Sequence, residues 1–402
     1  MSNRKERKIA DIVLVLFVAL LVGLGLGFSS GTTMSSENRA LAKFPSICVG
    51  KGVNWSFPSE LECWLNDRIG FRNELIDVSH LPAELLPGRY LKVGKYVWDR
   101  ESGWIWRMEG TRAEWKESFI RDVAEELVEF RDWLREKGAE LWFLLVPQRT
   151  VVYRRQALEM HADEIGEGSV EKLTRVLTDA LGDRFLCPIE QLQKAAEREQ
   201  VFYKTSHHWS EYGAFVGWRE LAERICVAHG MAAGDALHES SYRISVDNLV
   251  REDSLMFSRK SRSIGQYAKM LGFSDDDYPQ SLLSTPYAHY FHKHQGSLKG
   301  RRTAVPGLLP GKRARYVGVY PRAAPLRTLV LGTSHTNVML PFMPYTFSPL
   351  EFIRINGGQV EERRMFCLRQ LYGREFDSFK PDVVILCLSM PNLFSLHKIN
   401  KE

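Results

Sequence analysis

The chain has 402 residues, of which 44% are hydrophobic and 26% are charged, so it is long enough for one large globular domain or two smaller ones. The formal net charge is +5, and because several positive charges lie in the first eight residues, the remainder of the chain is nearly balanced. The sequence contains no basic stripe interleaved with aromatic residues and no glycine-rich phosphate loop, which argues against nucleic-acid or nucleotide binding.

The N-terminal segment predicts a membrane anchor. Basic residues within 1–8 precede an uncharged apolar run from Ile12 to Phe28, and about 17–20 apolar residues are enough to cross a bilayer. A cleaved signal peptide is the alternative, but its apolar region is usually about 7–15 residues long. Because basic residues stay on the cytoplasmic side, we expect a cytoplasmic N-terminus at 1–8, a transmembrane anchor at 9–29 and an outward-facing remainder.

Residues 30–110 are expected to form a linker and an N-terminal extension, and 111–402 the main domain, because regular apolar periodicity begins at that point. Apolar residues at helical spacing predict helices, and short apolar runs predict buried strands. The predicted helices cover 113–137, 170–181, 189–199, 213–229 and 361–376. The predicted strands cover 140–146, 184–187, 328–331, 351–355 and 382–388.

Residues 234–325 interrupt this pattern with scattered Pro, Gly and His, and such a long irregular stretch is expected to be a lid or an insertion. On either side of it, short apolar strands alternate with helices. That alternation predicts an α/β fold in which helices cover both faces of a parallel sheet. Ligands bind at the carboxyl ends of the strands in such sheets, so polar residues directly after the predicted strands are candidates for a site.

Ser334 follows a predicted strand and Gly332, a position that exposes the hydroxyl and often opens a helix. The backbone N–H groups of such a helix start are suited to stabilise a developing oxyanion, although a Ser at this position can also be a simple helix cap. Asn392 follows the last predicted strand, and Gly357 and Gly358 follow the strand before it. An amide side chain and a backbone N–H at these points are further oxyanion candidates, although turn formation also favours Gly and Asn.

A second polar segment contains His207 and His208 beside Trp209, ahead of a predicted helix. An imidazole against an apolar wall is a candidate general base, because its ordinary pKa lies near neutrality. Adjacent histidines also bind metals, but the sequence shows no third ligand at a metal-binding spacing, so we predict no metal. Purely structural histidines are the remaining alternative.

Several short segments after residue 36 carry a family resemblance. They are Glu-Asn-Arg-Ala-Leu-Ala at 37–42, Leu-Asn-Asp-Arg-Ile-Gly-Phe-Arg at 65–72, Gly-Trp-Ile at 103–105, Val-Pro-Gln-Arg-Thr-Val-Val-Tyr at 146–153, His-Trp-Ser at 208–210 and Gly-Thr-Ser at 332–334. Together they resemble the AlgX/AlgJ family, whose SGNH hydrolase-like domain O-acetylates alginate and other exopolysaccharides in the periplasm. The order, with the histidine ahead of the serine, also resembles this family and is permuted relative to ordinary SGNH esterases.

The resemblance implies an SGNH hydrolase-like fold in which Ser334 is the nucleophile and His208 the base of a polysaccharide O-acetyltransferase. Trp209, Arg149 and Tyr153 are the expected substrate-binding residues. Because acetyl-CoA does not reach the periplasm, the acetyl group is expected to come from a membrane-bound O-acyltransferase partner, with no cofactor. The N-terminal helix is then expected to anchor a single-pass protein in the inner (cytoplasmic) membrane, with its C-terminal domain in the periplasm.

Two positions depart from the pattern of this family. Ser206 stands where the family carries the Asp of its Asp-x-His-Trp motif, and Thr333 stands where it carries the Asp before the nucleophile. The first departure is the more serious, because a triad carboxylate orients the imidazole and stabilises its cation. A hydroxyl at 206 can bond to the ring N–H of the imidazole but cannot offset its charge.

These departures leave several alternatives open. The enzyme is either a weaker Ser-His dyad or recruits a carboxylate from elsewhere, for which Asp247, Asp253 and the acidic run at 275–277 are candidates. The main alternative function is a non-catalytic polysaccharide-binding or scaffold subunit of an exopolysaccharide synthesis complex. A carbohydrate esterase, which would use water as the acceptor, is a weaker alternative.

Overall fold

A computed structural model describes the chain at 33–34, 39–40, 42–49, 52–54, 56–68, 88–93, 96–107, 115–159, 167–232, 234–247, 287–292, 302–303, 313–316, 320–355 and 376–396. Two compact units are distinguished, Met1–Gly88 with Lys269–Phe273, and Arg89–Ala268 with Ser274–Glu402. The predicted anchor at 9–29 lies outside the described residues. Within those residues, the structure has no helix with the length and apolar character that a bilayer crossing requires.

The described part of the first unit consists of four two-residue strands and one helix. They are β1 (Thr33–Met34), β2 (Arg39–Ala40), β3 (Cys48–Val49), β4 (Gly52–Val53) and α2 (Phe57–Arg68). The side-chain amide of Asn54 donates to the carbonyl of Ser46 over 2.9 Å and to the Glu60 carboxylate over 3.0 Å. These bonds tie the chain before α2 to its first turn.

A seven-stranded sheet forms the centre of the second unit, in the order β12-β13-β15-β14-β16-β8-β9. The strands are β8 (Glu140–Val146), β9 (Phe185–Leu186), β12 (Arg302–Thr303), β13 (Arg313–Tyr316), β14 (Thr328–Gly332), β15 (Leu350–Arg354) and β16 (Val383–Ser389). The run from β15 to β9 is parallel, and β13 joins its edge antiparallel to β15. The predicted α/β class with a parallel sheet is therefore confirmed.

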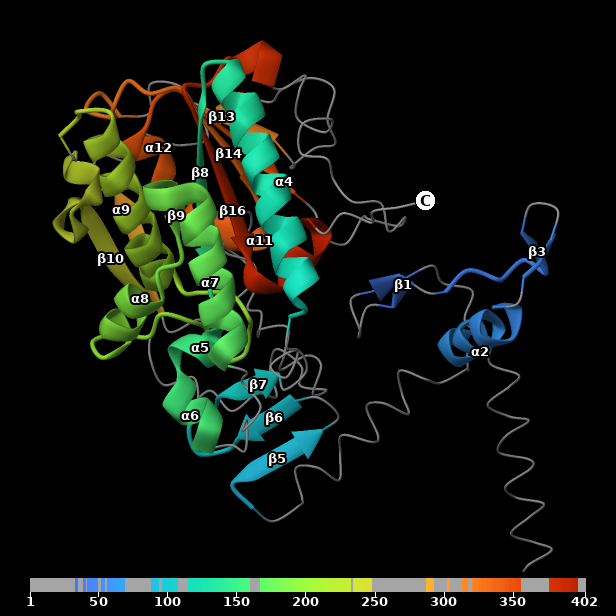
Figure 1. The fold of residues 1–402 in the computed structure, drawn as a ribbon. Helices are drawn as coiled ribbons and strands as arrows, with labels where there is room; N and C mark the ends of the chain where they lie inside the picture. Colours follow the sequence, from blue (N-terminus) through green and yellow to red (C-terminus); the bar gives the residue numbers. More distant parts are fainter. Residues whose placement is uncertain are drawn as a thin grey trace, which may run out of the picture. The chain divides into compact units, whose positions relative to one another are not determined.

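Each central strand sends alternate side chains into two separate hydrophobic cores. In β8, Trp142 and Leu144 face one core, whereas Leu141 and Phe143 face the other. Helices α9 (Glu211–Ala228) and α11 (Ser334–Met339) close the first core, and α4 (Glu117–Glu136) and α7 (Glu167–Leu181) close the second (Figure 1). Burial on both faces explains why these strands are nearly continuous apolar runs in the sequence.

The predicted elements of the main domain agree with the structure to within a few residues where it is described. The second unit also contains the helices α5 (Arg149–Val152), α6 (Arg154–Glu159), α8 (Ile189–Ala196) and α12 (Met343–Thr346). Short 3-10 turns lie at Gly182–Arg184, Asp235–Leu237, Glu239–Ser241 and Met390–Leu396. The predicted helix at 361–376 lies almost wholly outside the described residues.

The segment expected to be irregular, 234–325, contains strands. In addition to β12 and β13 of the main sheet, β10 (Tyr242–Asp247) pairs antiparallel with β11 (Tyr287–His292). The expectation of an irregular stretch was wrong at these points. β10 and β11 form a two-stranded ribbon and β12 lies at the sheet edge, positions that commonly carry polar and charged side chains. β13, next to the edge, alternates Arg with Ala and Tyr, so it too lacks the apolar run that marks the central strands.

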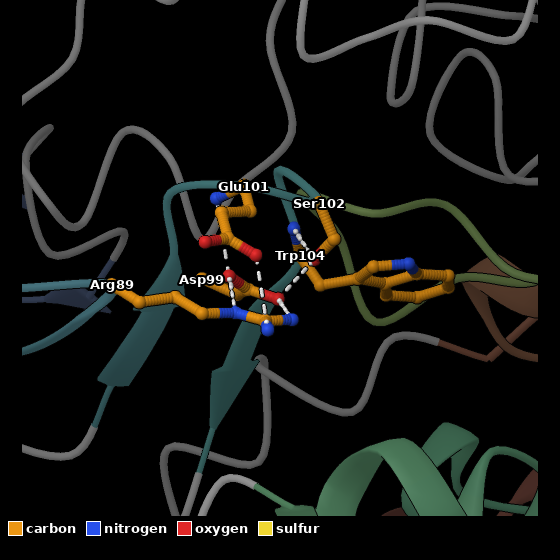
Figure 2. Close-up of polar contacts among 5 residues, drawn as sticks. All are labelled: Arg89, Asp99, Glu101, Ser102 and Trp104. Atoms are coloured by element: carbon orange, nitrogen blue, oxygen red, sulfur yellow. Dashed lines mark hydrogen bonds and ion pairs between the residues drawn. The ribbon is translucent and has the colours of Figure 1, made fainter.

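A small antiparallel sheet precedes the main one and is fixed by a buried carboxylate. It consists of β5 (Tyr90–Val93), β6 (Tyr96–Asp99) and β7 (Ile105–Arg107). Figure 2 shows Asp99 accepting hydrogen bonds from the Arg89 guanidinium over 2.9 and 3.0 Å and from the Ser102 hydroxyl over 2.6 Å. Burial raises the pKa of Asp99, but these bonds outweigh it and hold the pKa below its usual value. The turn before Trp104 is therefore held by a charged carboxylate.

Helix α9 approaches its neighbouring loop so closely that one position requires glycine. A Cβ on Gly213 would clash with the backbone carbonyl of Val201. We expect Gly213→Ala to lower the free energy of unfolding by about 1–3 kcal/mol, as overpacking does, although Ala is favoured over Gly in a helix by about 1 kcal/mol. Urea denaturation measures the change. Glu125→Ala, at an exposed site on α4, is the control, and a Gly213→Ala protein as stable as its parent would contradict the close approach.

Candidate active site

The Ser334 turn lies at the carboxyl end of β14, in the middle of the sheet. Thr333 is extended, and Ser334 then opens α11, with its side chain partly exposed. A Cβ on Gly332 would clash with the side chain of Thr336 one turn into the helix. The glycine therefore permits the abrupt change from strand to helix that presents the serine hydroxyl at the edge of the sheet.

His208 meets this serine from a distant part of the chain. It lies in a loop closed by a bridge between Phe202 and Trp209 and by a 3.1 Å hydrogen bond from the Tyr203 amide to the His208 carbonyl. Nε2 of His208 is 2.8 Å from Oγ of Ser334, although the two residues are 126 positions apart in the sequence. The structure thus brings together the predicted nucleophile and base at hydrogen-bonding distance.

Ser206 occupies the other side of the same imidazole. Its Oγ lies 3.0 Å from Nδ1 of His208, and its side chain is fully buried. When the Nδ1–H donates to Ser206, the lone pair on Nε2 faces Ser334, which is the tautomer that a general base needs. The result is a chain of hydrogen bonds from Ser206 through His208 to Ser334, with a hydroxyl where the resemblance led us to expect a carboxylate.

The structure does not describe the side chains of the other candidate carboxylates. Asp247 ends β10, where only the backbone is described, and Asp253 and 275–277 lie outside the described residues. The predicted carboxylate from elsewhere therefore stays a prediction. Thr333, the second departure from the family's pattern, is buried beside the nucleophile at the end of β14.

Arg149 supports the loop at 202–209 that carries His208. Its side chain is 4% exposed, and Nη1 donates to the carbonyls of Tyr203, Lys204 and Ser206 over 2.8, 3.0 and 2.9 Å. The guanidinium also lies over the Trp106 ring, 4.8 Å from its centroid. These three charge-assisted hydrogen bonds fix the backbone that carries Ser206 and His208. These contacts give Arg149 a positioning role.

Tyr153 and Trp209 also use their polar groups within the protein. The Tyr153 hydroxyl accepts a 2.9 Å hydrogen bond from the Val201 amide, and burial raises the pKa of this hydroxyl to about 12. Trp209 is fully buried, and its Nε1 donates to the carbonyl of His335 over 2.9 Å. We assign both side chains positioning roles, and their predicted part in substrate binding stays a prediction.

His335 is a site residue that the sequence analysis did not single out. It is 3% exposed, follows Ser334 in α11, and its Nε2 lies 3.2 Å from the carbonyl of His207. Its ring centroid is 4.7 Å from that of His208 and 5.3 Å from that of His207. Burial, and then the neighbouring His208, lower the pKa of His335 well below its usual value, so the ring is neutral. Its position directly after Ser334 in the sequence was the signal that could have identified it.

The oxyanion candidates divide between described and undescribed residues. Asn392 follows β16, the parallel neighbour of β14, and its Oδ1 accepts a short hydrogen bond from the Ser389 hydroxyl. Gly357 and Gly358 lie outside the described residues. The chain that leads to them is bonded beside the Ser334 turn, because the amide of Ile355 donates to the carbonyl of Gly332 over 2.7 Å.

The comparison with protein families confirms the resemblance for part of the chain. Residues 98–249 match the family model described as the SGNH hydrolase-like domain of the acetyltransferase AlgX. This range contains Ser206 and His208 and ends before Ser334. No curated protein sequence matches the chain.

Solved structures that are similar to this chain have low sequence identity. PatB1 of Bacillus cereus has a TM-score of 0.48 and 14% identity, over 77% of this chain and 99% of its own. A DHHW family protein from Eubacterium siraeum has a TM-score of 0.44 and 13% identity, over 77% and 94%. The O-acetyltransferase domain of Pseudomonas putida AlgJ has a TM-score of 0.44 and 15% identity, over 76% and 93%.

The buried contacts of Arg149 generate a prediction. We expect Arg149→Ala to lower the free energy of unfolding by about 3 kcal/mol, because hydrogen bonds from a charged donor are lost and buried carbonyls are left unpaired. Amide hydrogen exchange measured by mass spectrometry should speed up at 201–209 in particular. Arg155→Ala, at an exposed arginine of α6, is the matched control. Unchanged exchange at 201–209 in Arg149→Ala would contradict the positioning role.

Proposed function

Because residues 98–249 carry an SGNH hydrolase-like domain of the AlgX acetyltransferase family, we propose that this protein transfers acetyl groups to hydroxyls of an alginate-like extracellular polysaccharide. Ser334 is the nucleophile and His208 is the general base. The observation that carries the proposal is the 2.8 Å separation of His208 Nε2 and Ser334 Oγ at the carboxyl edge of the sheet. At this distance a proton passes directly from the hydroxyl to the ring.

The reaction takes place in two halves. In the first, His208 Nε2 accepts the proton of Ser334 as the serine oxygen attacks the acetyl carbonyl of the donor. His208 then gives that proton to the departing donor group. This leaves Ser334 acetylated and His208 neutral. In the second half, His208 deprotonates a sugar hydroxyl, which attacks the acetyl carbon and releases Ser334, and His208 returns its proton to the serine oxygen.

Ser206 directs the imidazole but leaves its cation uncompensated. Its hydroxyl at Nδ1 selects the productive tautomer and holds the ring against Ser334. In serine proteases, loss of the triad carboxylate lowers kcat by about 10⁴-fold. We therefore infer a slow Ser-His dyad, in which positioning by Ser206 replaces only one of the two functions of the carboxylate.

The developing oxyanion is stabilised by donors at the edge of the sheet. The backbone N–H of Ser334 is one, and we propose the Asn392 amide and a backbone N–H of Gly357 or Gly358 as the others. Such donors each contribute about 10²–10³-fold in rate in other acyl-transfer enzymes. The adjacent, parallel placement of β14 and β16 supports the inclusion of Asn392, because their carboxyl ends bring residues 334 and 392 to one edge.

The donor and the location follow from the same proposal. An N-terminal helix at 9–29 anchors the protein in the inner membrane, and the domain works in the periplasm. Acetyl groups then arrive from a membrane-bound O-acyltransferase partner, with no cofactor held by this chain. The length and apolar character of the 9–29 segment support this arrangement.

A specific observation favours a second candidate, a non-catalytic polysaccharide-binding or scaffold subunit. Ser206 stands in place of the expected carboxylate, and it is fully buried against the imidazole. A protein selected for binding alone would have no need of that charge. Retained glycan binding together with absent acyl chemistry would identify this function, and release of acetate to water instead of sugar would identify an esterase.

The nucleophile is tested by acetyl release from a chromogenic acetate ester. We expect Ser334→Ala to lower kcat at least about 10³-fold, because no group replaces the attacking oxygen. Ser169→Ala, at a partly buried serine of α7, should keep the parent rate. Mass spectrometry of the parent with the ester should also show one acetyl group on Ser334. Equal rates for Ser334→Ala and the parent would remove Ser334 from the mechanism.

The missing carboxylate can be supplied at position 206. We expect Ser206→Asp to raise kcat about tenfold or more with little change in KM, because a carboxylate at Nδ1 stabilises the imidazolium of the transition state. Ser206→Asn, which has the same shape without the charge, is the matched control and should give no increase. Steady-state kinetics on the same ester, with unfolding curves for each variant, measure this. Equal kcat for the Asp and Asn variants would contradict a role for His208 as base.

A further inference from the structure

Three imidazoles converge at the site, although the sequence predicted only two. His207 and His208 come from the loop, and His335 comes from α11. Their nearest ligand nitrogens all lie within 4.8 Å of one another. His335 is buried, whereas His207 and His208 are partly exposed.

The hydrogen bonds of His335 determine which of its nitrogens is free. Nε2 lies 3.2 Å from the carbonyl of His207, and because a carbonyl only accepts, Nε2 carries the proton. The lone pair is then on Nδ1, which is buried and has no hydrogen-bond partner within the described part of the chain. Buried polar atoms are nearly always paired, so an orphaned nitrogen lone pair in a histidine cluster points to a ligand.

His208 likewise has one ring nitrogen bonded to a protein oxygen and a lone pair on the other. Its Nδ1 is paired with Ser206 over 3.0 Å, which leaves the lone pair of Nε2 directed out of the loop. Metal-binding histidines commonly have this arrangement, with one ring nitrogen bonded to a protein oxygen and the other on the metal.

We propose that His207, His208 and His335 form a binding site for Zn²⁺ or a similar borderline transition-metal ion, and that metal occupancy and acyl transfer at Ser334 exclude each other. Three imidazoles with an open fourth position are a frequent zinc environment. Zinc–nitrogen bonds of about 2.0–2.1 Å require ligand nitrogens about 3.3 Å apart, so the rings must close inward from their present separation. An all-nitrogen site does not suit Mg²⁺ or Ca²⁺, which prefer oxygen ligands.

The exclusion follows from one lone pair. Nε2 of His208 accepts the Ser334 proton in the proposed reaction, and it has a single lone pair to offer. Bound metal withdraws that lone pair, so the site would act as an inhibitory switch over the base. The metal site goes beyond the proposed acetyltransferase function, because it requires the three rings alone and would exist in a protein with no acyl chemistry.

The test is metal titration of the full chain. Isothermal titration with ZnCl₂ should show one ion per chain, and Co²⁺ should give the visible absorption bands of a tetrahedral nitrogen site. We expect His335→Gln to weaken Zn²⁺ binding at least about tenfold, because the Gln amide can still donate to the His207 carbonyl but offers only a carbonyl oxygen, a weaker zinc ligand, in place of the Nδ1 nitrogen. His238→Ala, at an exposed histidine outside the cluster, should bind as the parent does.

Two further measurements separate this proposal from the proposed function. Ser334→Ala should bind Zn²⁺ at least as tightly as the parent, and MgCl₂ should give no binding heat. If the parent hydrolyses a chromogenic ester, ZnCl₂ should inhibit it with the affinity seen by titration. An inactive parent that binds Zn²⁺ through His335 would overturn the acetyltransferase proposal alone. Equal Zn²⁺ affinity in the parent and in a folded His335→Gln protein would overturn the metal site alone.

Discussion

The hydrogen bond between His208 Nε2 and Ser334 Oγ depends on several supports that hold two distant segments within 2.8 Å. On the serine side, the parallel register of β14 with its neighbours fixes the end of the strand, and Gly332 permits the turn. On the histidine side, Arg149 binds three carbonyls of the loop. A bond from Trp209 to the carbonyl of His335 then joins the two segments directly. The bonds from Arg149 to Tyr203 and Ser206 and the bond from Trp209 are buried, so water competes little with them.

The same burial explains why the site combines strong positioning with weak electrostatics. Ser206 is fully buried and bonded to the imidazole, so it restricts the ring as a carboxylate would. It brings no charge, however, and the imidazolium cation of the proposed acyl transfer is stabilised less in a poorly solvated setting. The neighbouring neutral rings of His207 and His335 surround the base with further nitrogen lone pairs. A site of this composition suits slow acyl chemistry and metal binding, and both depend on the same nitrogen of His208.

The supporting structure around the site extends beyond the central sheet. The turn held by Asp99 leads into Trp104 (Figure 2). The amide of the next residue, Ile105, donates to the carbonyl of Lys204 over 3.0 Å, in the loop that carries His208. The stacked rings of Trp104 and Trp106 lie against the Arg149 guanidinium. The aromatic segment at 103–106 therefore supports the loop that carries His208.

The sequence was enough to predict the central strands and helices, the α/β class and the residue types of the site, because apolar periodicity and turn residues are local properties of the chain. It did not reveal β10 to β13, whose short or polar sequences contain no continuous apolar run. The sequence did not predict that Ser206, His208 and Ser334 form one hydrogen-bonded row or that His335 joins the other two histidines. It also did not predict that Arg149 and Tyr153 bind backbone groups inside the protein. Arg149 is 54–57 residues from the carbonyls that it binds, and His208 is 126 residues from Ser334, so no local pattern encodes these contacts.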